Sequence, residues 1–129
     1  MNVIRKFLDA RDGSVTVEFV LWVPFMVLSI LIPVDGTMLL FRQAEMTDLA
    51  RDASRQVALG YRTPEEAEDR LAVALDDGRD YTIDVRQENG FVTTTISVPF
   101  SDVLLFGGPF SRDATISGRV TMLEEQSNA

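Results

Sequence analysis

One uninterrupted apolar run limits what this chain can fold into more than any other feature. Residues 19–34 read FVLWVPFMVLSILIPV and contain no charged side chain and a single hydroxyl. Counted from Ser14, the segment has 21 residues, and as a helix it would be about 31 Å long at ~1.5 Å per residue. That length matches the ~30 Å hydrocarbon core of a bilayer. The sequence therefore predicts one membrane span near the N-terminus.

The charges that flank this span predict its orientation. Arg5, Lys6 and Arg11 precede it, whereas the first charge after it is Asp35. Because cytoplasmic flanks carry the excess of Lys and Arg, we expect the N-terminus in the cytoplasm and the C-terminal part outside it. The apolar run is also longer than that of a secretory signal, and no small-x-small cleavage site follows it. Asp35-Gly36 is interpreted as the outer boundary between membrane and water.

The helix is predicted to continue beyond the span as an amphipathic segment. One apolar stripe with the spacing i, i+3, i+4, i+7, i+11 consists of Met46, Leu49, Ala50, Ala53 and Val57. We expect a single helix from about Ser14 to Leu59 that ends at Gly60. Pro24 and Pro33 lie inside it, and each removes a backbone donor and favours a kink.

The rest of the chain supplies a packing partner for that stripe. Thr63-Pro64-Glu65-Glu66 predicts a helix start, and the short helix should run to about Leu75. YTIDVRQ and FVTTTISVPF predict two strands joined by an Asn-Gly turn, and ATISGRVTMLEE predicts a third. SDVLLFGGPFSRD between the last two is expected to be a loop. Its apolar side chains, Leu104, Leu105, Phe106 and Phe110, are either core or a contact surface.

The expected fold class is therefore α+β, with a long N-terminal transmembrane and amphipathic helix, a short second helix and a small three-stranded antiparallel β-meander. The expected division of the chain is a cytoplasmic leader at residues 1–13, a transmembrane helix at 14–34, an amphipathic continuation at 35–60 and an extracytoplasmic α+β domain at 61–129.

Composition argues against several classes of function. The chain has no Cys and no His, so it lacks thiolate and imidazole metal ligands and the commonest general base. A net charge of −8 disfavours a nucleic-acid partner. Motifs typical of enzymes are absent, so we expect no catalytic residues, no metal and no cofactor. The acidic residues of the 65–80 region fit no EF-hand pattern and are interpreted as a solvated face.

The start of the apolar segment carries one ionisable group that needs an explanation. A basic leader ends at Gly13, an apolar helix follows at once, and Glu18 is its fifth residue. With the leader and the later QAEMTDLARDASRQVALG segment, GSVTVEFVLWVPFMVL resembles the TadE-like family of minor pseudopilins, which belong to the tight-adherence (Flp) pilus assembly machinery and have a type IV prepilin-like N-terminus. The resemblance covers about residues 5–60 and does not extend over 61–129.

The resemblance implies a processing site and a set of partners. Gly13 would be the last residue of the leader, and a prepilin peptidase would cut on the cytoplasmic face to make Ser14 the new N-terminus. Type IV pilins more often begin with phenylalanine or methionine, so serine is a departure. Glu18 matches the family's glutamate. The implied location is the bacterial inner membrane in a single pass, and the implied partners are other pilins or pseudopilins and the Tad/Flp machinery.

Elementary chemistry explains why a glycine at the cut and a glutamate one helical turn beyond it would suit such processing. Glycine offers a protease a backbone with no side chain to clash. Cleavage would create an α-ammonium group on the first turn of a helix, and a carboxylate four residues on lies one turn above it. An ionisable group inside a membrane is costly, so a counter-ion for Glu18 is expected in this subunit or in a neighbouring one.

Two other classes of function stay open at this point. The first is a plain signal anchor that carries a periplasmic binding or sensor module, with Glu18 at the interface and Gly13 as a helix-start residue. Retention of residues 1–13 in the mature protein would favour it. The second is a small membrane-tethered enzyme, which the missing motifs make the weakest of the three.

Overall fold

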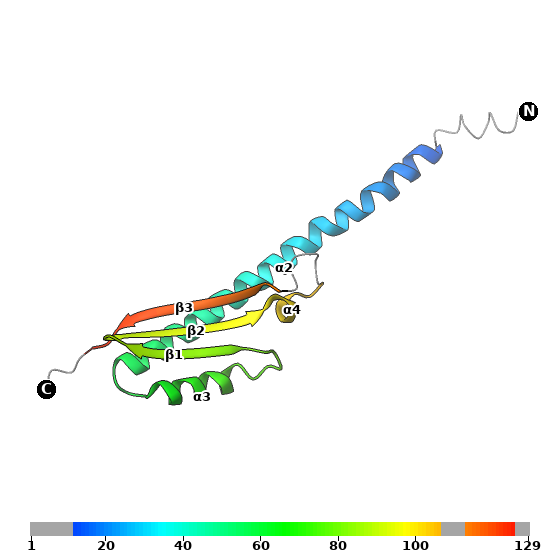
Figure 1. Cartoon of the computed structure of the whole chain (residues 1–129). Coiled ribbons are helices and arrows are strands. Elements are labelled where there is room, and N and C mark those ends of the chain that lie inside the picture. Colours follow the sequence, from blue (N-terminus) through cyan, green and yellow to red (C-terminus); the bar gives the residue numbers. More distant parts are fainter. Residues whose placement is uncertain (1–11, 107–112, 126–129) are drawn as a thin grey trace, which may run out of the picture. The chain divides into compact units, whose positions relative to one another are not determined.

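A computed structural model of the protein describes residues 12–106 and 113–125, with side chains described from Val15 onward. Its element order is α2 (Asp12–Ala58), α3 (Pro64–Ala74), β1 (Thr82–Glu88), β2 (Phe91–Pro99), α4 (Phe100–Val103) and β3 (Thr115–Leu123), as Figure 1 shows. This confirms the α+β class. The predicted basic leader residues, Phe110 and the last four residues lie outside the described ranges.

The chain divides into two compact units, Met1–Val34 and Asp35–Ala129. Helix α2 contributes to both. It is assigned as one helix of 47 residues that continues through Pro24 and Pro33. The predicted bounds, Ser14 to Leu59, differ from the observed ones by one or two residues, which is the usual uncertainty of helix ends.

The C-terminal end of α2 has the geometry of a Schellman motif. The N–H of Tyr61 donates to the carbonyl of Gln56 at 2.9 Å, and the N–H of Gly60 donates to that of Val57 at 2.9 Å. Gly60 has a φ of +72°, a conformation that glycine adopts without a Cβ penalty. The predicted role of Gly60 as the helix stop is confirmed.

Helix α3 begins with the predicted capping box. The Thr63 hydroxyl accepts from the N–H of Glu66 at 3.2 Å, and the Glu66 carboxylate accepts from the N–H of Thr63 at 3.1 Å. Pro64 occupies the first turn, where its missing N–H removes no helical hydrogen bond.

The three strands form an antiparallel sheet in the order β1-β2-β3, as predicted. Asn89 and Gly90 both have positive φ values, 53° and 78°, which is the type I′ geometry that joins paired strands tightly. Glu88 accordingly pairs with Phe91 directly across the turn. Along β2, residues of one face are buried and those of the other are partly exposed.

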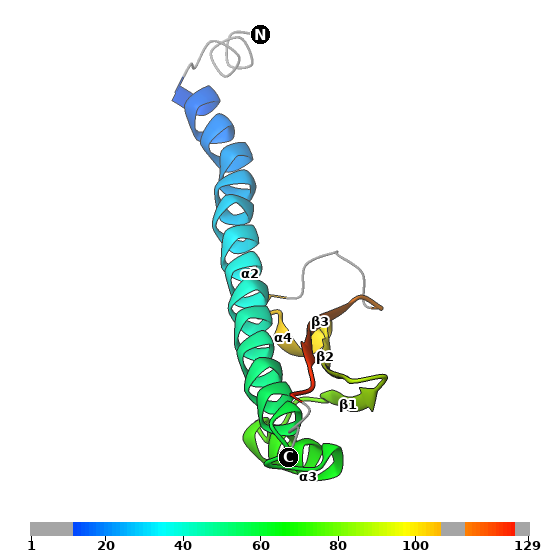
Figure 2. The ribbon, with the colours of Figure 1, turned by 90° about the vertical axis from the view of Figure 1, so that its left-hand side faces the viewer.

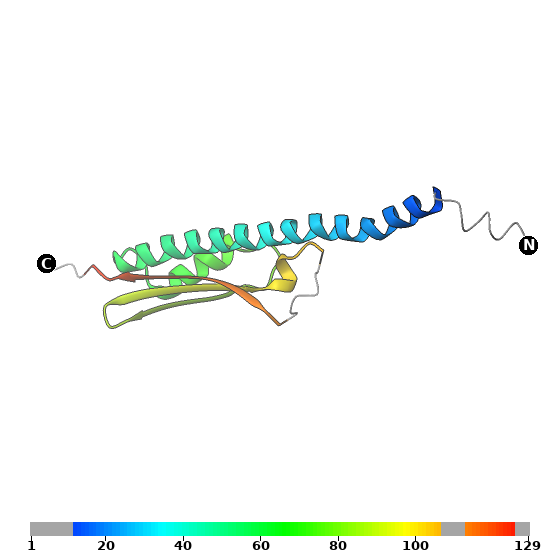
Figure 3. The same ribbon diagram turned by 90° about the horizontal axis from the view of Figure 1, so that it is seen from above.

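The second unit has one hydrophobic core between the sheet and the helices. Residues 35–58 of α2 run along one face of the sheet (Figure 2), and the view from above shows the same arrangement (Figure 3). The predicted stripe of α2 is buried at Met46, Ala50, Ala53 and Val57 and partly buried at Leu49. This stripe shares one core with apolar residues of β2 and of the α3 region. They are Val92, Ile96 and Val98 of β2, and Ala67, Leu71 and Leu75 of the α3 region.

Two contacts set how closely these layers approach. A Cβ built on Gly118 of β3 would lie 2.8 Å from the backbone nitrogen of Thr47 and 3.0 Å from the carbonyl carbon of Met46, so only glycine fits where β3 meets α2. Inside the core, the Ser54 hydroxyl donates to Thr94 Oγ1 at 2.8 Å, and both side chains are fully buried. The pairing satisfies two polar groups that burial would otherwise leave unbonded.

The segment between β2 and β3 corrects one prediction. Residues 101–113 were expected to be a loop and Phe100 the end of the preceding strand, but Phe100–Val103 form one helical turn, α4. The turn buries Val103, and the N–H of Leu104 donates to the carbonyl of Phe100 at 3.0 Å. A stretch this short has no helical periodicity that a sequence could reveal.

Candidate functional site

The predicted processing site lies at the beginning of α2. The backbone of Gly13 and Ser14 is helical. Glu18 lies four residues beyond Ser14 in the same helix, which corresponds to about one turn and ~6 Å along the axis. The structure therefore places the Glu18 side chain one turn above the peptide bond that cleavage would convert into an amine.

The Glu18 side chain is exposed and surrounded by apolar neighbours. Val15, Val17 and Phe19 beside it are 62–69 % exposed. Within residues 12–106 and 113–125, the structure contains no ion pair that involves Glu18. Its carboxylate is thus open to a partner from outside the described part of this chain.

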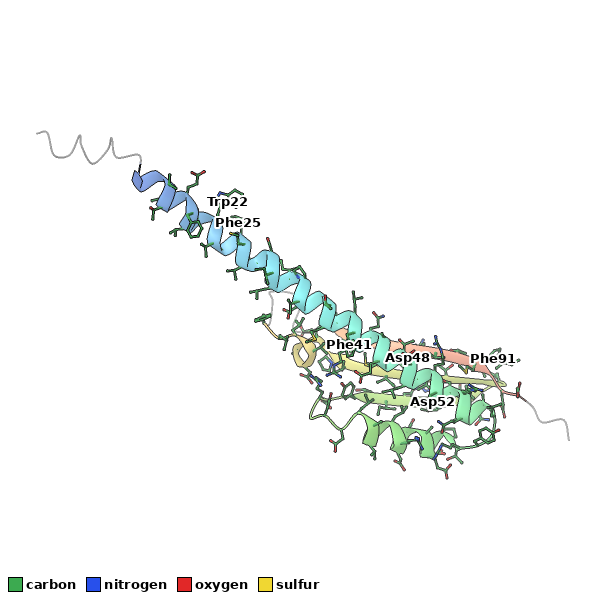
Figure 4. All side chains as sticks on the ribbon, turned by 180° about the vertical axis from the view of Figure 1, so that it is seen from behind. Trp22, Phe25, Phe41, Asp48, Asp52 and Phe91 are labelled. Carbon is green, nitrogen blue, oxygen red and sulfur yellow. The ribbon has the colours of Figure 1, made fainter. Side chains whose placement is uncertain are left out.

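The remainder of the first unit presents apolar side chains on all sides. Trp22 and Phe25 lie next to each other with ring centroids 6.2 Å apart and ring planes at 59° (Figure 4). None of the most apolar window of 18 residues is buried, and α2 is the one helix among the described residues that is long and apolar enough to cross a membrane. A single N-terminal helix of this kind fits a single-pass membrane protein.

Asp35, the first residue of the second unit, has a role that the sequence did not reveal. Its place at the outer membrane boundary stays a prediction, and in the structure Asp35 is only 9 % exposed. Its Oδ1 accepts from the backbone N–H of Leu105 at 3.0 Å and from that of Phe106 at 3.3 Å. The partners are 70 and 71 residues away, so no local pattern could have predicted this contact.

The loop that Asp35 binds resolves the earlier alternative of core or contact surface. Leu104 is partly buried, whereas Leu105 and Phe106 are 59 % and 55 % exposed. Within the described residues, the apolar centre of this segment therefore consists of one partly buried residue and an exposed pair.

A cluster of polar groups holds the start of β1 to α2 and α4. The Asp77 carboxylate lies 3.6 Å from the guanidinium of Arg42 and pairs with that of Arg79. Arg79 also donates to the carbonyl of Asp102 at 2.9 Å, and the Tyr81 hydroxyl donates to Asp77 at 3.3 Å. The arrangement ties three segments together by charge-assisted hydrogen bonds.

This cluster changes the acidity of two of its members. Partial burial acts to raise the pKa of Asp77, but the backbone N–H and the positive charge of Arg79 outweigh it and hold the pKa below its ordinary value. The pKa of Tyr81 is raised, first by burial and then by the negative charge of Asp77. Both shifts have causes in the local structure, namely burial and the neighbouring charges.

Some of the acidic residues of the 65–80 region have a structural role. Glu66 completes the capping box, and Glu68 accepts from the N–H of Val85 at 2.8 Å, which gives a partner to a backbone donor on the outer edge of β1. No group of three or more acidic side chains that could hold a metal ion occurs in the described ranges. The outer face of α2 likewise carries exposed charges, with Asp48 and Asp52 on its surface (Figure 4) and Arg51 at 3.7 Å from Asp48.

Comparison with known proteins bears on this first helix. A family model described as TadE-like protein matches residues 13–55, about a third of the chain. The resemblance to the TadE-like family is therefore confirmed over the segment that begins at Gly13 and includes Ser14 and Glu18. No curated protein and no solved structure matches the chain.

Proposed function

We propose that this protein is a minor pseudopilin that takes part in assembly of a Tad/Flp-type pilus. The observation that carries the proposal is the match to the TadE-like family over residues 13–55, because that family consists of pilus assembly components. The match begins at the glycine that would end the leader. It covers the whole apolar span and most of the helix that packs on the sheet.

In this proposal a prepilin peptidase cuts the chain after Gly13, on the cytoplasmic face of the inner membrane. The residue before the cut has no side chain, and the first residue after it, Ser14, has a small one. The new α-ammonium group of Ser14 would then lie in the first turn of α2. Residues 1–13 would serve as the leader and residues 14–34 as the span.

Glu18 is the proposed partner of that ammonium group. Its carboxylate is exposed in an apolar stretch, and a charge in that setting is strongly disfavoured unless it is paired. An ammonium group one turn away, or that of a neighbouring subunit, would supply the opposite charge. The pair would also favour one register when two such helices pack side by side.

The exposed apolar surface of the first unit supports a role in which this helix packs against the helices of other subunits. An all-apolar helix leaves lipid only by packing against other apolar helices. The second unit, made of residues 35–129 with residues 61–129 as its α+β part, would then lie outside the cytoplasm. There it would cap, prime or regulate the pilus as a binding domain without catalysis of its own.

The test is a complementation experiment in cells that carry this protein naturally. The gene for this protein is deleted, and the cells are complemented with the wild-type gene or with one that encodes Glu18→Gln or Glu18→Asp. Surface pili are then counted, and the amount of membrane-inserted protein is measured in the same cells. Glu18→Gln should insert normally but reduce pilus number, because an unpaired ammonium group would remain among packed helices. Glu18→Asp should be milder, since the shorter carboxylate keeps the charge.

The plain-anchor alternative predicts a different result. If Glu18 only rests at the membrane surface, Glu18→Gln should insert slightly better and leave pilus number at the wild-type level. That outcome would remove the pairing role. Normal pili in the deletion strain itself would contradict the proposed function as a whole.

A further inference from the structure

The exposed pair Leu105 and Phe106 is one feature that the proposed function leaves unexplained. Both side chains are more than half exposed, whereas Val103, two residues before Leu105, is buried in the core. Two adjacent large apolar side chains in a loop are unfavourable in water. They are favourable where the loop meets an apolar or interfacial medium.

The contact with Asp35 holds this loop close to the end of the apolar run. Asp35 is joined directly to Val34, the last residue of the apolar run, and it is the first charged residue after that run. Its carboxylate oxygen lies 3.0 Å and 3.3 Å from the backbone nitrogens of Leu105 and Phe106. If the span ends at Val34, as proposed, the loop is therefore fixed to the residue that directly follows that end.

The hydrogen bonds to Asp35 also make the loop suited to the membrane surface. A backbone N–H that leaves water must find another acceptor, because the hydrocarbon region offers none. Asp35 supplies one acceptor to both N–H groups. The loop can then present its side chains to lipid without unbonded donors at this point.

We propose that Leu105 and Phe106 form a foot that rests in the lipid headgroup region on the outer side of the bilayer, next to the point where α2 leaves it. Phe and Leu side chains are suited to this boundary. The foot gives the second unit another contact with the membrane besides α2, so that the domain is held in one orientation at the surface. The inference rests on the proposed membrane span.

The experiment uses tryptophan fluorescence in the full chain reconstituted into phosphatidylcholine and phosphatidylglycerol vesicles. The chain has a single Trp, Trp22, so Trp22→Phe gives a silent background. Phe106→Trp reports on the foot. The matched control is Phe91→Trp, which replaces an aromatic residue of similar exposure, 48 %, at the opposite end of β2. The two ends of β2 are eight residues apart, which corresponds to about 26 Å, so Phe91 lies far from the end of the strand that leads to the loop.

With lipids brominated near the headgroup, the Phe106→Trp signal should be quenched several-fold more than the Phe91→Trp signal. Adding Asp35→Ala should reduce the quenching toward the control value, whereas Asp35→Asn, which keeps the acceptor oxygen, should retain it. Equal, weak quenching of the two reporters would overturn the foot. So would a blue-shifted Phe106→Trp spectrum without bromine quenching, because protein rather than lipid would then cover the loop.

The native Trp22 separates this failure from failure of the proposed span. Quenching of wild-type Trp22 by lipids brominated deeper in the chains shows that the span is inserted. If Trp22 is quenched and Phe106→Trp is not, the foot is wrong while the span stands. If neither is quenched, the span itself is contradicted.

Discussion

The two parts of α2 are made of the same helical backbone but are shaped by different surroundings. Before Val34 the helix is apolar on every side, and none of its most apolar window is buried. From Asp35 onward, one side of α2 packs on the sheet, and Met46, Ala50, Ala53 and Val57 are buried there. The other side is exposed and carries apolar side chains such as Phe41 as well as charged ones such as Asp48. The first part needs a medium or partner from outside the chain, whereas the second part carries its own partner in the sequence that follows it.

This difference decides which substitutions each part should tolerate. In the first part, apolar character matters on all sides and exact shape matters little. In the second part, exact fit matters on one side, and the other side is free to vary.

The largest effect is expected from a charge in the middle of the span. Leu28→Arg should reduce membrane insertion by about 3 kcal/mol, because Leu28 is exposed to lipid in our account. Phe41→Arg is the matched change in the second part, where Phe41 is 63 % exposed on the outer side of α2 (Figure 4). It should leave insertion unchanged. Alkaline extraction of membranes measures both, and equal loss in the two variants would remove the contrast.

A smaller effect is expected where β3 meets α2. Gly118→Ala should destabilise the second unit by about 1–3 kcal/mol, since the new methyl group would press on the backbone at Met46 and Thr47. Gly36→Ala is the matched control, because a Cβ there meets nothing within 4 Å and alanine favours a helix. Hydrogen exchange of core amides in the full-length protein should show faster opening for Gly118→Ala alone.

The buried hydroxyl pair should have an effect of about 1–2 kcal/mol. Ser54→Ala removes the donor to Thr94 and leaves a buried hydroxyl without that partner. Ser54→Ala combined with Thr94→Val removes both polar groups and should recover much of the lost stability. Urea unfolding of Ser54→Ala, of Thr94→Val and of the double variant tests this, and a double variant that loses the sum of both single effects would contradict the pairing.

The smallest effect concerns pH. Because the pKa of Asp77 in the folded protein is held below its ordinary value, ionised Asp77 stabilises the fold above about pH 4. That contribution is lost as the pH falls through the lowered pKa. The stability difference between wild type and Asp77→Asn should therefore shrink as the pH falls from neutral to below the ordinary pKa of an aspartate. A difference that is constant over this range would show that the charge of Asp77 is not involved.

Much of the fold could be predicted from sequence because its signals are local. The capping box at Thr63, the Asn89-Gly90 turn and the stop at Gly60 each depend on neighbouring residues, and the structure confirms all three. The buried stripe of α2 was predicted for the same reason, since its period is fixed by the helix itself.

The features that were missed depend on distant partners. Asp35 binds a loop 70 residues away, and Gly118 is fitted to a helix that precedes it by about as much. Nothing near either residue in the sequence indicates these contacts. The one-turn helix α4 was missed because four residues carry no period.

In the proposed function, α2 of the working protein begins with a free amine at Ser14. Intact-mass analysis of the protein isolated from the membranes of its own cells measures this directly. The account predicts chains that lack residues 1–13, and it predicts that a large side chain in Gly13→Leu blocks the cut, whereas Gly13→Ala permits part of it. Finding only full-length chains that begin at Met1, in cells with an active prepilin peptidase, would contradict the claim.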